Sequence, residues 1–392
     1  HITYWTLYKD KDTSKKHPTL SPPMWDLDAL QPDDLTLPKL LQEAGYHTIH
    51  VGKAHLGAVD SPGGEPTNLG FDVNVAGHGA GGPGSFYGTH RFMSTRYSME
   101  FTNKQVWDVP GLEKYHDQEI FLSEALAIEA CNTLDKAVAT GKPFFLHFAP
   151  YAVHTPIMPN PKYIAKYADI DKIEAAYATM IESADAALGS VLNKLDALGI
   201  ADNTIVIFTS DNGGLSAVAR AGEPHTHNAP LRSGKGSAYE GGIRVPLIVR
   251  GLDREASINT LNVITHDLFP TILKYAEVSF PENHIIDGMA LDDNYETRVI
   301  GWHQPHQWGA SGPGIEPFTA IRQGKWKLIF FHHGERYELY NLKKDIGETN
   351  NVIAHYPQVF SEMRNTLLNW AINRDAQPSI LTETGQPVLW HE

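Results

Sequence analysis

The chain has 392 residues, 42% of them hydrophobic and 20% charged, which is enough for one large domain and a smaller one. Its 46 acidic and 32 basic residues leave a formal net charge of −14, which argues against a nucleic-acid-binding surface. No apolar run approaches the roughly 20 residues that span a bilayer, and the single cysteine, Cys131, excludes an intrachain disulfide framework and a cysteine-only zinc site.

The first elements alternate between helix and strand. Residues 1–34 are polar and contain several prolines, so we expect a long loop there. A short helix is expected over residues 36–45, because Thr36 is a good N-cap and the segment ends in glycine. Residues 46–51, Tyr-His-Thr-Ile-His-Val, then predict a strand.

A long segment without regular periodicity follows. Residues 58–116 are rich in glycine and contain scattered aromatic residues, which favours an ordered loop that lines a substrate site. Beyond it, the spacing of apolar residues predicts a helix over residues 117–139, a strand over 143–149 and a second helix over 173–198.

The next strand carries the clearest functional signal. Residues 205–208 are all apolar and predict a central strand of a parallel sheet, buried on both faces. Asp211 and Asn212 come directly after it, and their oxygens suit Ca²⁺, with Mg²⁺ the less favoured ion. The plainer alternative is an ordinary strand-to-loop turn, since Asp-Asn-Gly is common in turns.

Several other strands and loops also end in polar residues. Ligands of open α/β sheets bind beyond the carboxyl ends of the strands, so these residues are expected to meet. Each alone has an ordinary explanation, such as a solvated lysine or a buried histidine. Together, two lysines, several histidines and a cation would suit a tetrahedral oxyanion. The candidates are Lys53, His55, His154, His225, His227 and Lys235.

The end of the chain has a different pattern of apolar and polar residues. Between residues 298 and 340, short apolar runs separated by glycine and polar turns predict an antiparallel meander, and a helix is expected over 357–373. The fold class is therefore α/β. We expect a large domain over residues 1–293, with a central, mostly parallel sheet flanked by helices, and a small α+β domain with an antiparallel sheet over 294–392.

The sequence resembles the type I, formylglycine-dependent sulfatases of the alkaline-phosphatase-like superfamily. The motifs follow one another in the order of that family and extend into the C-terminal part of the chain. The matching segments are residues 37–57, 143–156, 202–214, 234–246 and 320–329.

This resemblance implies roles for the candidates. Lys53 and Lys235 would hold the sulfate, and Lys53 would also steady the nucleophile. His55 would help the hydrated aldehyde break down after sulfate transfer, and His154 would contact the sulfate and protonate the leaving alcohol. The family often has tryptophan where this chain has Ala54.

The resemblance also implies a cofactor and a modified residue. Asp211 and Asn212 would be two ligands of a calcium ion, while two further aspartates and a Cys- or Ser-x-Pro-x-Arg motif would lie upstream. That motif, whose first residue becomes formylglycine in the family, does not occur in the chain, and Cys131 does not fit it. We therefore expect the sequence to be an N-terminally truncated sulfatase, inactive without the nucleophile and the missing ligands.

The favoured interpretation is hydrolysis of a sulfate ester on a carbohydrate, with the 58–116 loop, His225 and His227 shaping the sugar pocket. A phosphonate- or phosphodiester-cleaving relative and a non-catalytic, sulfated-glycan-binding protein are the alternatives. The presence or absence of the nucleophile motif upstream would distinguish these three interpretations. The substrates usual for the family imply an extracytoplasmic location, and the oligomeric state stays open.

Overall fold

A three-stranded parallel sheet forms the centre of the larger part of the molecule. The computed structural model describes residues 17–23, 29–94, 105–251, 255–291 and 298–390. Strand β2 (His47–Gly52) lies between β3 (Val73–Val75) and β4 (Phe144–Ala149). Both neighbours are parallel to β2, with Ile49 opposite Val73 and Leu146.

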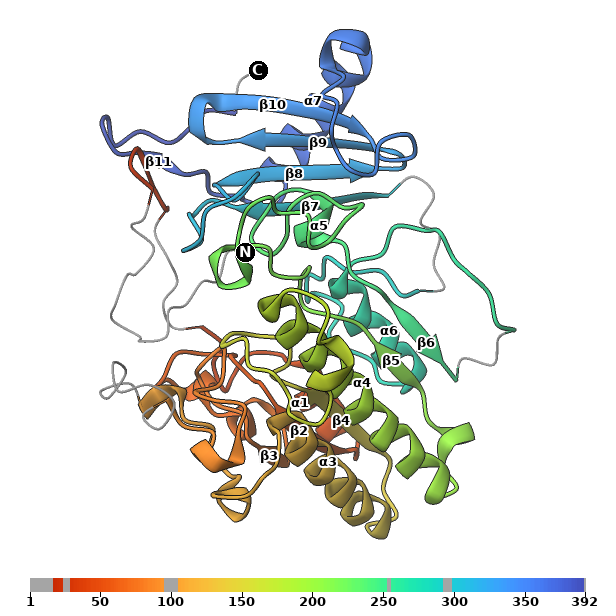
Figure 1. Cartoon of the computed structure of the whole chain (residues 1–392). Helices are drawn as coiled ribbons and strands as arrows, with labels where there is room; N and C mark the ends of the chain where they lie inside the picture. Colours follow the sequence, from red (N-terminus) through yellow and green to blue (C-terminus); the bar gives the residue numbers. More distant parts are fainter. Residues whose placement is uncertain (1–16, 24–28, 95–104, 252–254, 292–297, 391–392) are drawn as a thin grey trace.

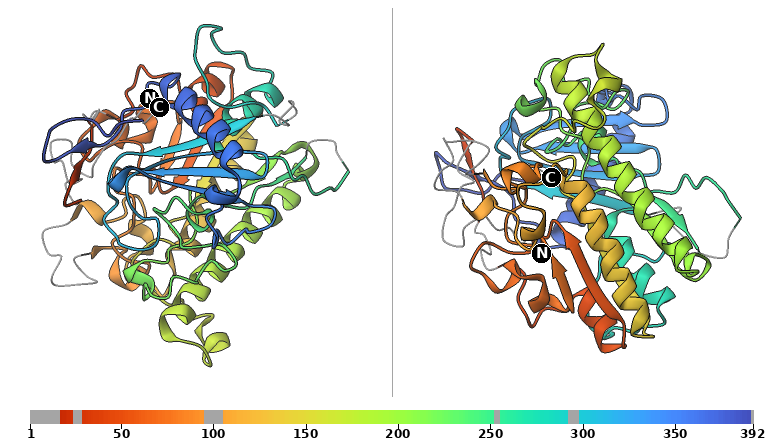
Figure 2. Two further views of the ribbon diagram at one scale, coloured as in Figure 1. Left: turned by 90° about the horizontal axis from the view of Figure 1, so that it is seen from above. Right: turned by 60° about the horizontal axis from the view of Figure 1, so that its bottom comes forward.

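Helices cover both faces of this sheet. The long helices α3 (Leu122–Ala139) and α4 (Lys172–Ala197) lie side by side on one face, where they share a core with Ile49 and Val51 of β2 (Figure 2). On the other face, α1 (Leu37–Glu43) and α6 (Leu268–Tyr275) pack leucines against Phe145 of β4. Successive side chains of β2 and β4 point to opposite faces of the sheet, so these strands contribute to two separate hydrophobic cores.

Local signals explain where these helices begin and end. The Thr36 hydroxyl accepts a hydrogen bond from the backbone N–H of Lys39, and Gly45 has a φ of +92°, so both predicted ends of α1 are confirmed. Helix α3 begins at Leu122 and not near residue 117 as predicted. Asp117 has a φ of +62°, a left-handed conformation that no helix can include.

The prediction of a buried central strand at residues 205–208 is wrong. Within the described ranges, β5 (Val206–Phe208) pairs only with β6 (Ile248–Arg250), and the two strands are antiparallel. Ile205 is 38% exposed and Phe208 is 40% exposed. Apolar β-branched and aromatic residues predict a strand, whereas burial depends on which neighbours the strand acquires, and the local pattern does not contain that information.

The 58–116 segment contains one short strand and several 3₁₀ helices. Its residues 73–75 form β3 and so extend the parallel sheet, which the sequence did not predict because three residues are too few for a period. Its residues 95–104 lie outside the described ranges. The remainder includes short 3₁₀ helices at Pro62–Gly64, Pro66–Leu69, Gly88–His90, Gln105–Trp107 and Glu113–Tyr115.

A four-stranded antiparallel sheet forms the C-terminal part, as predicted (Figure 1). Helix α7 (Pro357–Ile372) packs against it and contributes Met363 and Leu367 to the shared core. The predicted domain boundary at residues 293 and 294 lies outside the described residues and stays a prediction. The strands, in sheet order, are β10 (Arg336–Asn341), β9 (Trp326–Phe331), β8 (Phe318–Gln323) and β7 (Val299–Gln304).

Smaller elements connect the two parts. Strands β1 (Leu20–Ser21) and β11 (Ile380–Leu381) pair with each other, and the short helix α5 (Glu240–Ile243) lies close to the antiparallel sheet in Figure 1. None of the helices in the described ranges is both long and apolar enough to cross a bilayer. Further 3₁₀ helices lie at Ile164–Tyr167, Ala201–Asn203, Val218–Arg220, Thr265–Asp267, His333–Glu335 and Ile353–His355.

Candidate functional site

The carboxyl ends of three strands bring polar side chains together. Lys53 follows β2 directly, and its backbone N–H donates to the carbonyl of Ala149 at the end of β4, with an N–O distance of 2.7 Å. This bond fixes the exit of β2 beside the segment that leads to His154. Asp211 follows β5, and its Oδ2 lies 3.2 Å from Lys53 Nζ, so the third strand end meets the other two.

Asp211 and Lys53 form an ion pair that is open to solvent on one side. The Asp211 side chain is 66% exposed and that of Lys53 is 20% exposed. Burial tends to raise the pKa of Asp211, but Lys53 and then Lys235 outweigh it and hold this pKa below its usual value. The carboxylate is therefore ionised at neutral pH and offsets part of the positive charge of the lysines.

Lys235 is the cation of the site that lacks a counter-ion bond. Its backbone N–H donates to the carbonyl of Gly214, three residues beyond Asp211, at 3.0 Å, which brings its loop to this rim. Burial lowers the pKa of Lys235, and the nearby Lys53 lowers it further. Within the described part of the chain, no hydrogen-bond acceptor or carboxylate pairs with its Nζ, and its aromatic neighbour is the ring of Trp308, whose centroid lies 5.8 Å away.

His55 and His154 form a wall of the same site. Burial lowers the pKa of each ring to about 4, and both lysines add to this effect, so both rings are neutral at pH 7. The glycine-rich segment explains how close they lie to the backbone. A Cβ atom at Gly81 would stand 2.6 Å from Nδ1 of His55, and one at Gly82 would stand 2.6 Å from Nδ1 of His154.

The tautomer of His154 follows from its neighbour. Its Nδ1 lies 2.9 Å from the carbonyl oxygen of Thr155, which can only accept, so Nδ1 carries the hydrogen. In the neutral ring, Nε2 is then an acceptor. His154 can donate a proton from Nε2 only after it has become positively charged.

The structure adds His78, which the sequence did not single out. Its carbonyl oxygen accepts from the backbone N–H of His55 at 3.1 Å. Its pKa is lowered to about 4 by burial, and its Nε2 is buried without a hydrogen-bond partner among the described residues. Only the glycines around it marked this segment as special in the sequence, and they gave no reason to choose the histidine.

His225 and His227 lie in a different set of contacts. His225 is 7% exposed, and its Nδ1 is 3.4 Å from the Ser216 hydroxyl. His227 Nε2 lies 3.5 Å from Glu174, whose two carboxylate oxygens accept from Arg220. These contacts attach the 214–233 loop to the start of α4, so both histidines support the loop that leads to Lys235.

Metal binding stays a prediction, for which the described residues offer two donors side by side. Asp211 supplies an ionised carboxylate and Asn212 an amide oxygen at adjacent positions. Calcium takes six to eight oxygen ligands. Over the described ranges, no group of three or more histidine, cysteine, aspartate or glutamate side chains is placed to hold a metal ion. These two residues would therefore make only part of a calcium site.

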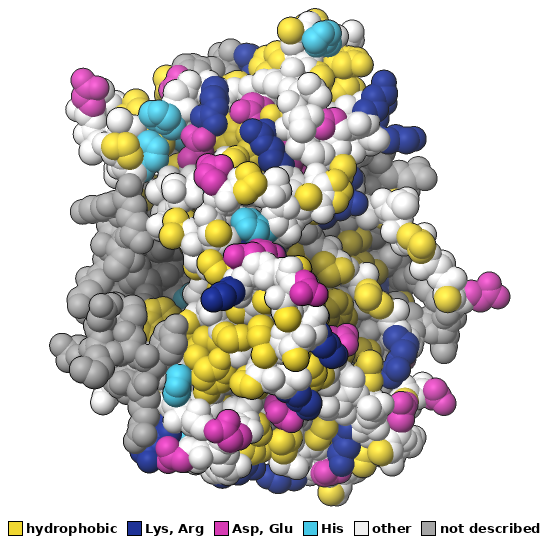
Figure 3. Space-filling model, in the orientation of Figure 1, with side chains coloured by type: hydrophobic (Ala, Val, Ile, Leu, Met, Phe, Trp, Pro, Cys, Tyr) yellow, Lys and Arg dark blue, Asp and Glu magenta, His cyan; other side chains and the backbone are white. Residues whose placement is uncertain are grey.

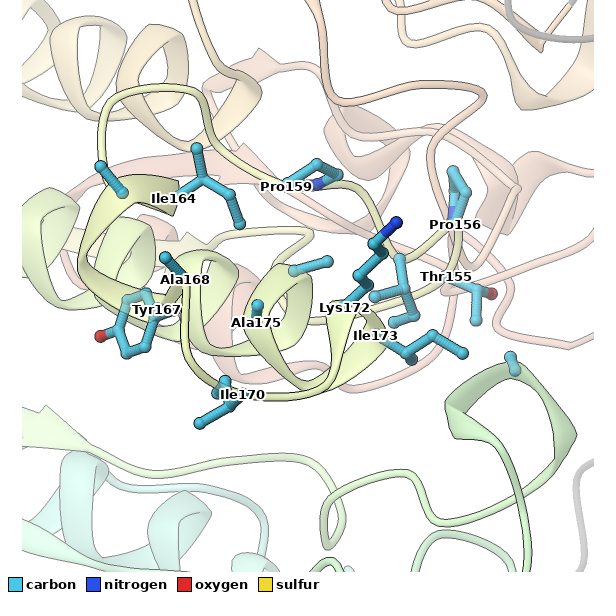
Figure 4. A pocket seen from close by; sticks show the side chains of 14 residues that line it. Thr155, Pro156, Pro159, Ile164, Tyr167, Ala168, Ile170, Lys172, Ile173 and Ala175 are labelled. Carbon is cyan, nitrogen blue, oxygen red and sulfur yellow. The ribbon is translucent and has the colours of Figure 1, made fainter.

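An apolar cavity of about 850 Å³ adjoins this cluster at Thr155 (Figure 4). Its walls are mostly aliphatic and include Pro156, Ile164 and Ile173, and Lys172 is the charged side chain that lines it. Hydrophobic side chains also gather near the centre of the face shown in Figure 3. Aliphatic walls give a charged ligand no hydrogen bonds, so the cation cluster and not this cavity is the candidate site for an anion.

The cluster has a clear chemical character. Two ammonium groups and one carboxylate leave it positive, and two neutral imidazoles stand beside them. A chain with a net charge of −14 thus concentrates positive charge at one rim. Such a site suits a compact anion with several oxygens, such as sulfate or phosphate.

Comparisons with known proteins agree with this character. The sulfatase family profile matches residues 10–278, and a profile described as N-sulphoglucosamine sulphohydrolase, C-terminal, matches residues 234–373. A sulfatase of Formosa agariphila is 30% identical over 92% of this chain and 74% of its own length. The N-acetylgalactosamine-6-sulfatase of Canis lupus familiaris is 30% identical over 85% of this chain and 69% of its own.

Solved structures with the same fold are also found. The crystal structure of Ps i-CgsB is 28% identical in sequence, with a TM-score of 0.72, over 88% of this chain and 75% of that one. Its complex with k-i-k-neocarrahexaose has a TM-score of 0.73 over the same shares. The helix-flanked parallel sheet with a C-terminal antiparallel sheet is therefore the architecture of these proteins too.

Proposed function

The chain belongs to the sulfatase family, and on this premise we propose that it acts on sulfate esters of a saccharide. The observation that carries the proposal is the Lys235 ammonium group, which lies beside Lys53 and has no protein acceptor in the described structure. An unpaired ammonium group in a partly desolvated site is costly unless an anion binds it. Sulfate oxygens would accept its hydrogen bonds.

Each side chain of the cluster then has a role in the hydrolysis. Lys53 and Lys235 would bind the sulfate and neutralise the charge that develops on its oxygens as the S–O bond to the sugar breaks. His154 would give a proton to the sugar oxygen that leaves. Because its Nε2 is an acceptor in the free site, it would have to take up that proton when sulfate binds. His55, on the same wall, would help to release the sulfate from the nucleophile after the transfer.

Two groups that the family uses enter as proposals. A calcium ion would supply Lewis-acid chemistry at the sulfate oxygens, and Asp211 with Asn212 would be two of its ligands. The nucleophile would be a formylglycine. The 392 residues contain no Cys- or Ser-x-Pro-x-Arg motif, and we assign the nucleophile to none of them.

The saccharide is proposed from the relatives. One relative is named N-acetylgalactosamine-6-sulfatase, and one similar structure was solved with k-i-k-neocarrahexaose. We propose that His225 and His227 shape the sugar pocket, because their contacts hold the loop between Gly214 and Lys235 in place. An extracytoplasmic location, expected from the substrates usual for the family, is part of the proposal.

Substitution of the lysines tests the function. Lys235→Ala and Lys53→Ala should each lower the rate of sulfate-ester hydrolysis about 100- to 1,000-fold, the typical cost of one preorganised donor. Lys325→Ala is the control, because Lys325 is exposed in the turn between β8 and β9 and should leave the rate unchanged. Hydrolysis is measured with protein that carries matured formylglycine, and binding of inorganic sulfate is measured by calorimetry on the 392-residue chain.

The outcomes separate the alternatives. Normal hydrolysis by Lys235→Ala would overturn the assignment of the sulfate site. Sulfate binding without any hydrolysis by the matured protein would favour the glycan-binding alternative. Faster release of phosphate than of sulfate from matched esters would favour the phosphoryl-cleaving alternative.

A further inference from the structure

The loop between β7 and β8 of the C-terminal sheet reaches the candidate site. Its residues 305–316 lie against the loop that carries Lys235, and two hydrogen bonds join them. The Ser237 hydroxyl donates to the carbonyl of Pro313 at 2.8 Å, and the backbone N–H of Ala238 donates to that of Gly314 at 3.0 Å. The C-terminal part therefore forms one side of the site.

This loop is also fixed internally. The side-chain amide of Gln307 donates to the carbonyls of Trp308, Ala310 and Ile315, at distances of 3.0, 3.1 and 3.1 Å. Satisfied hydrogen bonds of this kind hold a loop in one conformation. The backbone at Trp308 is thus fixed before any ligand arrives.

Trp308 lies directly on the Lys235 loop. A Cβ atom at Gly236 would stand 2.3 Å from Cε3 of the indole, and Gly236 has a φ of +86°, so only glycine allows this contact. The Lys235 ammonium lies 5.8 Å from the ring centroid. That is within the range, about 6 Å, over which an aromatic face attracts a cation.

The contact matters because Lys235 has little else to stabilise its charge. Burial and the proximity of Lys53 both disfavour the ammonium form, while Asp211 favours it. The Asp211 carboxylate is bonded to Lys53, which leaves the indole as the direct neighbour of Lys235. An aromatic ring stabilises an ammonium group but does not use up its N–H donors, so these stay available for sulfate oxygens.

We propose that Trp308 is a positioning residue for sulfate binding, whose indole face keeps the Lys235 ammonium aimed at the anion. The proposal rests on the proposed function, because it takes Lys235 as a sulfate ligand. It assigns part of the active site to the C-terminal antiparallel sheet.

Three variants distinguish the effect of the aromatic ring of Trp308 from the effect of its side-chain volume. Trp308→Leu keeps an apolar side chain without an aromatic face and should weaken binding of inorganic sulfate about two- to thirty-fold, the range of a cation–π contact. Trp308→Phe keeps a face and should recover most of the affinity. Trp326→Leu is the matched control, since Trp326 also lies near a lysine, with Lys325 Nζ 5.6 Å from its ring centroid, but away from the site.

Sulfate affinity is measured by calorimetry on the full chain, and thermal unfolding of each variant is followed in parallel. Equal affinities of Trp308→Leu and the parent would overturn the role of Trp308 and leave the proposed function intact. Equal losses in Trp308→Leu and Trp308→Phe would show that shape alone matters, which also overturns it. Failure of the parent to bind sulfate would instead overturn the proposed function, and this proposal with it.

Discussion

The protonation of His154 is set by the charges around it. In the free site, Lys235 and Lys53 face the ring and oppose its charge, while Asp211 and the Thr155 carbonyl favour it, and burial dominates to give a pKa of about 4. A bound sulfate would bring negative charge next to the same ring and raise this pKa. Binding should therefore take up a proton at any pH between the free and the bound value.

Proton uptake is a measurable prediction. At pH 5.5, we expect sulfate binding to be tighter than at pH 7.5, and its calorimetric enthalpy should vary with the ionisation enthalpy of the buffer. His154→Ala should remove part of this dependence, and His55→Ala another part, since both rings have a pKa of about 4. The experiment uses calcium-free buffer. Identical enthalpies in phosphate-free buffers of different ionisation enthalpy would rule out the coupling.

At this scale the sequence was informative where a residue follows a strand. Lys53, His154 and Asp211 each come soon after a predicted strand, and the structure brings them together, although β5 lies outside the parallel sheet to which the rule about strand ends applies. Trp308 and His78 could not be found in this way. Trp308 depends on a contact with Gly236, far from it in the chain, and His78 enters through a backbone bond to His55.

At the scale of elements, a buried ionic contact joins α5 to the antiparallel sheet. Lys327 of β9 lies 3.0 Å from Glu240 at the start of α5 and 2.8 Å from Glu348, and all three side chains are at most 2% exposed. The backbone N–H of Glu240 also donates to Glu348. Because Glu240 closely follows Lys235 in the chain, this contact fixes the loop that carries Lys235 to the C-terminal sheet.

Removal of the lysine should therefore affect both stability and the site. Lys327→Met keeps the length of the side chain but leaves the buried Glu348 without its cation, while Glu240 keeps Arg244 and Arg322. Loss of one partner of a buried ion pair typically costs about 3–5 kcal/mol of unfolding free energy. Sulfate affinity should fall as well, because the loop loses its anchor. Lys325→Met, two residues away and exposed, is the control. Denaturant unfolding and calorimetry measure the two effects, and a stable Lys327→Met protein would contradict the argument.

The elements themselves were largely predictable, whereas their neighbours were not. Thr36 and Gly45 marked the ends of α1 because capping is decided within a few residues. The stretch from Ile205 to Phe208 was correctly expected to contain a strand, but it pairs with β6 in antiparallel fashion and is partly exposed. Pairing depends on residues at least 40 positions away, here Ile248 to Arg250, which no local pattern contains.

At the scale of the whole molecule, buried neutral histidines occur in both parts of the protein. Burial lowers the pKa of His50 to about 3 and that of four others in the described structure, beyond His154, to about 4. Those four are His55, His78, His303 and His306. Two of them, together with His154, belong to the site, and the other two belong to the C-terminal part.

These values make the folded protein sensitive to acid. In the unfolded chain a histidine has a pKa near 6.5, so between pH 6.5 and 4 the unfolded chain binds protons that the folded protein does not. Stability is therefore complete above about pH 6.5 and falls as the pH decreases toward 4. For a group with a folded pKa of about 4, the loss by pH 5 is up to about 2 kcal/mol.

Thermal unfolding at pH 7.5, 6.0 and 5.0 should then show a melting temperature that falls steadily, most steeply below pH 6. Millimolar sulfate should offset part of the fall, because an anion in the site favours protonated His55 and His154. In Lys235→Ala the acid sensitivity should persist while the protection by sulfate is lost, since burial and not Lys235 lowers the pKa of His303 and His306. A melting temperature that stays constant from pH 7.5 to 5.0 would mean that these histidines are not buried in their neutral form.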